Sequence, residues 1–100
     1  DIIKAFIPYY QGSNQQAIIW IAESREKENA KYLIGKIDER VPERDVFDNY
    51  SSWVKDDTLV YHVEGMGWYN YYYQKGNRVY WVCIQGEDPR EIFNLIFKTL

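Results

Sequence analysis

The sequence predicts an α+β fold, a two-layer sandwich in which a five-stranded, mainly antiparallel sheet carries two helices on one face. Five segments have strand character and are separated by tight turns, and two segments repeat their apolar residues at helical spacing. The predicted order is ββαβββα. The chain has 100 residues, which is the size of one domain, so residues 1–100 are assigned to a single α+β domain.

The first half of the chain predicts a hairpin followed by a helix. Residues 4–11 and 16–22 are rich in β-branched and aromatic residues and are joined by a Gly-Ser-Asn turn. Ser24 is the expected N-cap of a helix over residues 25–40, and Pro42 should end it. The apolar positions of this helix form one stripe, made of Ala30, Leu33, Ile34, Ile37 and Val41.

Residues 42–57 are predicted to form an ordered loop. The segment is polar and acidic, but it also carries large rings. A flexible linker needs no such rings, so we expect Phe47, Tyr50 and Trp53 to hold the loop against the domain. These three residues are the candidates for covering an apolar face of the sheet.

The second half of the chain predicts three more strands and a closing helix. The strands cover residues 58–64, 68–74 and 78–85, joined by Gly-Met-Gly and Lys-Gly-Asn turns. Asp88 is the expected N-cap of a helix over residues 89–99, which has proline at its first position and glutamate at its third. The broad apolar face of this helix indicates that it is largely buried.

The two halves of the sequence align without a gap when residues 9–11 are placed on residues 72–74, since both read Tyr-Tyr-Gln. Asn14 then falls on Asn77, and the apolar helix positions coincide. This agreement favours two copies of a hairpin-plus-helix unit, a ββα pseudo-repeat, with one strand and the aromatic loop between them. The alternative is chance agreement between two hairpins that each precede a helix.

Side chains alternate between the two faces of a strand, which divides the predicted sheet into two surfaces. The surface expected beneath the helices contains Phe6, Tyr10, Ala17, Ile19, Ile21, Leu59, Tyr61, Val63, Tyr71, Tyr73, Tyr80, Val82 and Ile84. The opposite surface contains Ile7, Tyr9, Ile18, Trp20, His62, Trp68, Tyr72, Trp81 and Cys83. Its large rings together offer on the order of 700 Å², more than a monomer normally exposes. We therefore expect something to cover this surface.

The predicted function is a non-enzymatic binding or protein-interaction module that uses this aromatic face. Its candidate binding residues are Tyr9, Trp20, His62, Trp68, Tyr72 and Trp81. The partner would be another protein or a second copy of the chain in a homodimer. One alternative is a small-ligand site, for a sugar or an apolar molecule, under the 42–57 loop. A less favoured alternative is an enzyme that depends on His62.

Composition argues against several other functions. The net charge of −3 opposes nucleic acid or an anionic membrane as the main partner, because both attract basic surfaces. A single His and a single Cys do not suffice for a Cys/His metal site, so no metal or other cofactor is predicted. His62 and Cys83 form the only candidate Cys–His pair, but packed side chains are the simpler interpretation, and no catalytic residue is assigned. No apolar run is long enough to cross a bilayer.

Residues 63–84, with the sequence VEGMGWYNYYYQKGNRVYWVCI, and the helix after them resemble small uncharacterised α+β proteins of thermophilic bacteria. In those proteins a glycine-flanked aromatic strand precedes a strand with a Gly-Asn turn and a Tyr-Trp pair. The resemblance implies a compact domain and transfers no functional residue. The Lys- and Glu-rich first helix is compatible with a thermophile. Because the sequence begins with Asp1, a processed extracytoplasmic domain and a trimmed part of a longer chain are both open alternatives.

Overall fold

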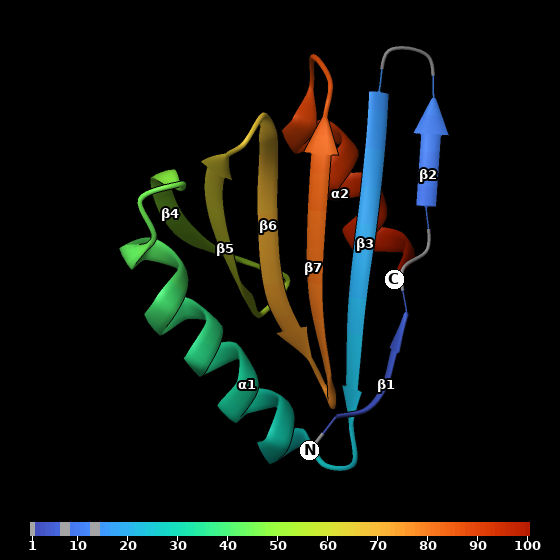
Figure 1. Cartoon of the computed structure of the whole chain (residues 1–100). Coiled ribbons are helices and arrows are strands. Elements are labelled where there is room, and N and C mark those ends of the chain that lie inside the picture. The colour runs from blue at the N-terminus through green and yellow to red at the C-terminus, as the bar shows by residue number, and fades with distance from the viewer. Residues whose placement is uncertain (1, 7–8, 13–14) are drawn as a thin grey trace.

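The computed structural model describes residues 2–6, 9–12 and 15–100, with side chains described for residues 15–100. In chain order the elements are β1 (Ile2–Phe6), β2 (Tyr9–Gly12), β3 (Gln15–Ser24), α1 (Lys27–Arg40), the 3-10 helix η1 (Val41–Glu43), β4 (Asp48–Lys55), β5 (Thr58–Gly65), β6 (Trp68–Lys75), β7 (Arg78–Gln85) and α2 (Pro89–Thr99) (Figure 1). The predicted α+β class is confirmed, and the predicted strands and helices occur in the predicted order.

One antiparallel sheet contains all of these strands. Its order is β1-β3-β7-β6-β5-β4, and β2 also pairs with β3. The first predicted strand includes β1 and β2, and its residues 7 and 8 lie outside the described part of the chain. Both β1 and β2 pair with β3 in the same register, with Phe6 opposite Ile21 and Tyr9 opposite Ile18. The pairing of β3 with β7 joins the two halves of the chain at the centre of the sheet.

Residues 42–57 do not form the predicted loop. They include β4, which pairs with β5 and adds an edge strand to the sheet. The loop prediction was wrong because an edge strand buries few side chains, and most of β4 is exposed, so its sequence lacks apolar alternation. β4 also has a bulge between Asp48 and Ser51, where Asn49 has a φ of 53°.

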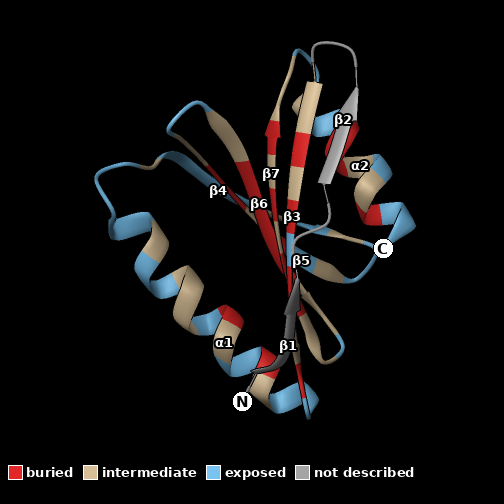
Figure 2. Ribbon diagram, turned by 45° about the vertical axis from the view of Figure 1, so that its right-hand side comes forward, coloured by how far each residue is buried: buried red, intermediate tan, exposed pale blue. Residues whose placement is uncertain are grey.

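The two helices lie on opposite faces of the sheet (Figures 1 and 2), so the prediction that both cover one face is wrong. Ala30 and Ile34 of α1 form one cluster with Val63, Tyr72 and Val79. The cluster formed by α2 lies on the other face and contains Ala17, Ile19, Ile21, Val60, Tyr71, Tyr73, Tyr80, Val82, Ile84, Ile92, Phe93 and Phe97. Because both faces of the sheet carry apolar rings, each needs its own helix.

The face assignment of β5 also needs correction. Tyr61 lies opposite Tyr72, and His62 lies opposite Tyr71. Tyr61 and Val63 therefore face α1, whereas His62 faces α2, the reverse of the prediction. Both alternating sets of β5 are apolar, so composition left the phase open, and the two-residue turn after Gly65 fixed the register.

The pseudo-repeat is seen in element order but not in helix placement. The first copy of the unit corresponds to β2, β3 and α1, and the second copy corresponds to β6, β7 and α2. An antiparallel pair such as β3 and β7 is related by a two-fold axis perpendicular to the sheet, and this axis would place both helices on one face. Their opposite placement shows that the two halves do not pack symmetrically.

The predicted helix caps form only in part. α1 begins after Glu26, and Ser24 is instead buried at the end of β3, where its backbone N–H donates to the Asn77 carbonyl at 2.8 Å. The Asn77 side-chain amide in turn donates to the Ser24 carbonyl at 2.8 Å. Asp88 is the N-cap residue of α2, as predicted, but its side chain makes no capping hydrogen bond.

Candidate functional site

An aromatic row crosses the face of the sheet that α1 covers. Trp20 of β3 lies opposite Trp81 of β7, which lies opposite Tyr72 of β6, which lies opposite Tyr61 of β5. The Trp81 and Tyr72 rings stack with centroids 4.9 Å apart, and the Tyr72 and Tyr61 rings with centroids 5.1 Å apart. Tyr72 is 0% exposed and Trp81 is partly exposed, whereas Trp20 is 49% exposed. The row thus runs from beneath α1 to open surface.

A carboxylate of α1 closes the buried end of this row. Asp38 Oδ1 accepts hydrogen bonds from the hydroxyls of Tyr50 at 2.8 Å and Tyr72 at 3.1 Å. Burial, then the charge of Asp38, raises the pKa of Tyr72 well above its ordinary value. Burial, then the hydrogen bond to Asp38, raises the pKa of Tyr50 to about 12. Both phenols therefore remain neutral donors, and Tyr72, a predicted binding residue, has a structural role.

The three rings predicted to cover the aromatic face are divided between two faces of the sheet. Phe47 lies against Trp81, with ring centroids 6.3 Å apart, and so covers part of the face as predicted. Tyr50 binds Asp38. Trp53 lies on the α2 face, edge-on to Tyr71 at 6.1 Å. The 42–57 segment therefore does not form a single cover.

Beyond α1 and Phe47, part of this face remains open. The open part, called here the aromatic surface, consists of side chains from β3, β6 and β7: Ile18, Trp20, Trp68, Trp81 and Cys83. Trp20 is exposed and the other four are partly exposed. In Figure 1, α1 runs diagonally to the lower left of β5 and β6, away from most of β3 and β7. The structure thus brings Trp20, Trp68 and Trp81 together on one face, as predicted.

Hydrogen bonds fix the position of Trp81 in the aromatic surface. Its indole N–H donates to Asn70 Oδ1 at 3.3 Å and to Cys83 Sγ at 3.1 Å. Asn70 is buried, and its amide donates to the Trp68 carbonyl at 3.3 Å. Burial raises the pKa of the Cys83 thiol, and the Trp81 hydrogen bond only partly opposes this, so the thiol stays protonated at neutral pH.

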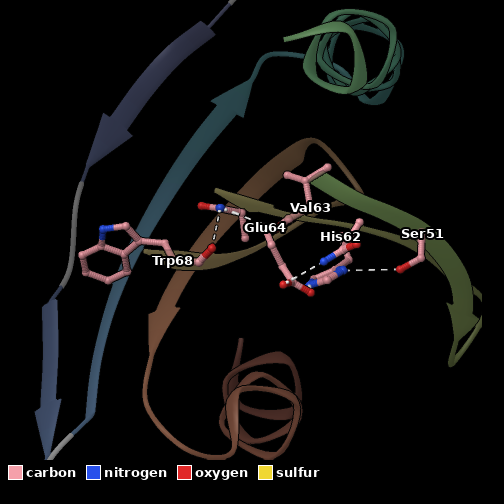
Figure 3. A network of polar contacts seen from close by, with 7 residues as sticks. Ser51, His62, Val63, Glu64 and Trp68 are labelled. Carbon is pink, nitrogen blue, oxygen red and sulfur yellow. Dashed lines mark hydrogen bonds and ion pairs between the residues drawn. The ribbon is translucent and has the colours of Figure 1, made fainter. Parts of the chain in front are cut away.

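His62 is separated from the other predicted binding residues. It faces α2, whereas Cys83 faces α1, so the two do not form a Cys–His pair. Figure 3 shows the Trp68 indole pointing away from His62. The side chain of Tyr9, the remaining predicted binding residue, lies outside the part of the chain whose side chains are described.

Around His62 the structure assembles a polar cluster that the sequence did not reveal (Figure 3). Ser51 Oγ lies 3.4 Å from His62 Nδ1, and Glu64 Oε2 lies 3.7 Å from His62 Nε2. Glu64 Oε1 accepts a hydrogen bond from the Asn49 side-chain amide at 3.1 Å. Burial lowers the pKa of His62; Glu64 and the Asn49 backbone oppose this effect, while the positive charge of Arg90 adds to it. The imidazole is therefore neutral at pH 7.

The wall of this cluster is aromatic and carries one cation. The His62 ring is stacked on Tyr69, with centroids 6.4 Å apart, and tilted against Tyr71 at 5.0 Å. The Arg90 guanidinium lies over the Trp53 ring, 3.9 Å from its centroid. Sequence reasoning missed this cluster because it missed β4. The signal that was present is Asp56-Asp57, a pair with positive φ that makes the two-residue turn between β4 and β5.

Within residues 15–100, no three His, Cys, Asp or Glu side chains are grouped so that they could hold a metal ion. In the same part of the chain no helix is long and apolar enough to cross a membrane.

The fold and its surfaces define an α+β protein with one antiparallel sheet between two helices, one open aromatic surface and one polar cluster. No protein-family model matches the chain, and no curated protein or solved structure is significantly similar to it.

Proposed function

We propose that this protein is an interaction module that binds a polypeptide through the aromatic surface. The observation that supports this most directly is the exposure of Trp20, 49% of which faces solvent although β3 is an inner strand of the sheet. Burying the exposed part, on the order of 100 Å², favours binding by about 2–3 kcal/mol before the costs of association. Exposed tryptophans of this kind are the anchors of many protein interfaces.

The rest of the aromatic surface suits a preformed binding site. Trp81 is held by its two hydrogen bonds and by Phe47, so its ring loses little freedom when a partner binds. Ile18 and Trp68 add apolar area to the face of the sheet that carries Trp20. Met66, in the turn before Trp68, is 72% exposed and flexible enough to adapt to a partner. An apolar segment of a polypeptide, including one from a second copy of the chain, fits this chemistry.

The test compares Trp20→Ala with Tyr32→Ala, because Tyr32 is another exposed ring but lies on α1. A displayed library of random peptides is selected on the wild-type protein, and self-association is measured by light scattering over a range of concentrations. We expect the wild type either to select apolar peptides or to form a dimer. Trp20→Ala should weaken the affinity of that complex at least tenfold, equivalent to about 1.4 kcal/mol, whereas Tyr32→Ala should leave the affinity unchanged. A monomer that selects no peptide, or binding that ignores Trp20→Ala, would overturn the proposal.

A further inference from the structure

We propose that Ser51, His62 and Glu64 form a nucleophile, a base and an orienting acid that hydrolyse small carboxylic esters. This activity is independent of the aromatic surface, because His62 lies on the opposite face of the sheet. The sequence offered His62 as an isolated candidate, and the pairing of β4 with β5 supplies the two missing groups.

Strand pairing positions the three side chains. Ser51 of β4 lies directly opposite His62 of β5, so their side chains share one face. Glu64 lies two residues further along β5 and shares that face. The imidazole therefore has Ser51 at Nδ1, 3.4 Å away, and Glu64 at Nε2, 3.7 Å away (Figure 3). Such contacts are often long before a substrate binds and shorten in the complex.

The two neighbours of the imidazole give its nitrogens different roles. A carboxylate beside Nε2 favours the tautomer that carries its proton there, which leaves the Nδ1 lone pair facing the Ser51 hydroxyl. This is the logic of a serine–histidine–acid triad, with the two ring nitrogens exchanged. Asn49 holds Glu64 in place through its 3.1 Å hydrogen bond, and the φ of 53° at Asn49 marks local backbone strain at the bulge.

Arg90 brings a positive charge to the His62 side of this cluster. It lies over Trp53, which is two residues from Ser51 on the same face of β4, and its charge reaches His62. A positive charge in such a site stabilises the oxyanion that forms when the ester carbonyl is attacked. Ser51 itself is exposed, so an ester can approach it from solvent.

The chemistry requires only the ester and water. Ser51 Oγ bonds to the ester carbonyl carbon while its proton passes to His62 Nδ1. The bond from that carbon to the alcohol oxygen then breaks, and His62 returns the proton to the departing alcohol. Water attacks the acyl group on Ser51, its proton again passes through His62 to Ser51 Oγ, and a carboxylic acid leaves.

The experiment measures hydrolysis of p-nitrophenyl acetate by the full chain and by Ser51→Ala, with Ser52→Ala as the matched control. Both serines are exposed neighbours on β4, but Ser52 lies opposite Tyr61 on the other face. We expect Ser51→Ala and His62→Ala to lower kcat/KM by roughly a hundredfold or more, whereas Ser52→Ala leaves it unchanged. Mass spectrometry should locate one acetyl group on Ser51.

The pH profile and the site of acylation separate this mechanism from surface reactivity. Because only neutral His62 can take the proton, kcat/KM should fall as the pH drops through the pKa of His62, which lies below its ordinary value of 6.5. Hydrolysis by the wild type that does not exceed that of Ser51→Ala would overturn the proposal, as would acetylation confined to lysine or tyrosine. Circular dichroism confirms that each variant is folded.

Discussion

The two faces of the sheet are covered in different ways. On the α2 face, Phe93 is completely buried, stacks on Tyr71 with centroids 4.3 Å apart and meets Tyr73 edge-on at 5.8 Å. On the α1 face, a polar link through Asp38 fastens the helix at one end, and Trp20 remains exposed at the other. One face is thus a core, while the other is part core and part surface. The difference shows how a small domain can keep an apolar surface open without losing its structure.

Phe93→Ala should have the largest effect on stability, because it empties the centre of the α2 face. We expect the free energy of unfolding to fall by about 3–5 kcal/mol. Leu95→Ala in the same helix is the control, since Leu95 is 64% exposed and should cost no more than about 0.5 kcal/mol. Urea denaturation of both variants measures the difference. Equal losses would show that α2 does not seal this face.

Asp38→Ala should have an intermediate effect and act on the α1 face. It removes the acceptor of Tyr72 and Tyr50, and the buried Tyr72 hydroxyl then lacks that partner. We expect a loss of about 1–3 kcal/mol, measured by urea denaturation. The neighbouring Glu39→Ala is the control, because Glu39 is exposed and pairs with Lys36 of the same helix at 3.8 Å. A loss no larger than that of Glu39→Ala would mean that apolar packing alone holds α1 to the sheet.

Protonation of His62, which lies on the face of the sheet that α2 covers, should have the smallest effect on the free energy of unfolding. Its pKa in the folded chain lies below 6.5, so the unfolded chain binds its proton first as the pH falls. The contribution of neutral His62 to the free energy of unfolding is therefore fully present above pH 6.5, and it is lost as the pH drops towards the pKa of His62 in the folded chain. Urea denaturation at several pH values should show this loss in the wild type, and His62→Gln should reduce the slope. The prediction would be contradicted if the free energy of unfolding of the wild type rose as the pH fell through this range. It would also be contradicted if His62→Gln left the slope of that free energy against pH unchanged.

The helices and hairpins could be predicted from sequence because their signals are local. Pro89 begins α2 at the predicted residue, and two-residue turns delimit β5, β6 and β7. The face that each helix covers could not be predicted, because the apolar stripe of α1 is compatible with either side of a sheet that carries rings on both. That choice depends on packing between segments far apart in the chain.

The candidate sites were predictable to different degrees for the same reason. Alternation alone placed Trp20 and Trp81 on one face, since the predicted alternation of β3 and β7 is the one that the structure shows. The cluster of Ser51, His62 and Glu64 depends on an edge strand with little apolar pattern and on a register set by two turns. Neither feature is visible in the local composition.

The central position of β7 has a consequence for how the chain reaches its native state. β3 pairs with β7 on one side, yet more than fifty residues separate the two strands. During synthesis from the N-terminus, β3 therefore waits with an unpaired inner edge until β7 has also been made. In that interval its Trp20 and Ile18 are open to unwanted association, so folding in the cell should be most vulnerable just before β7 emerges.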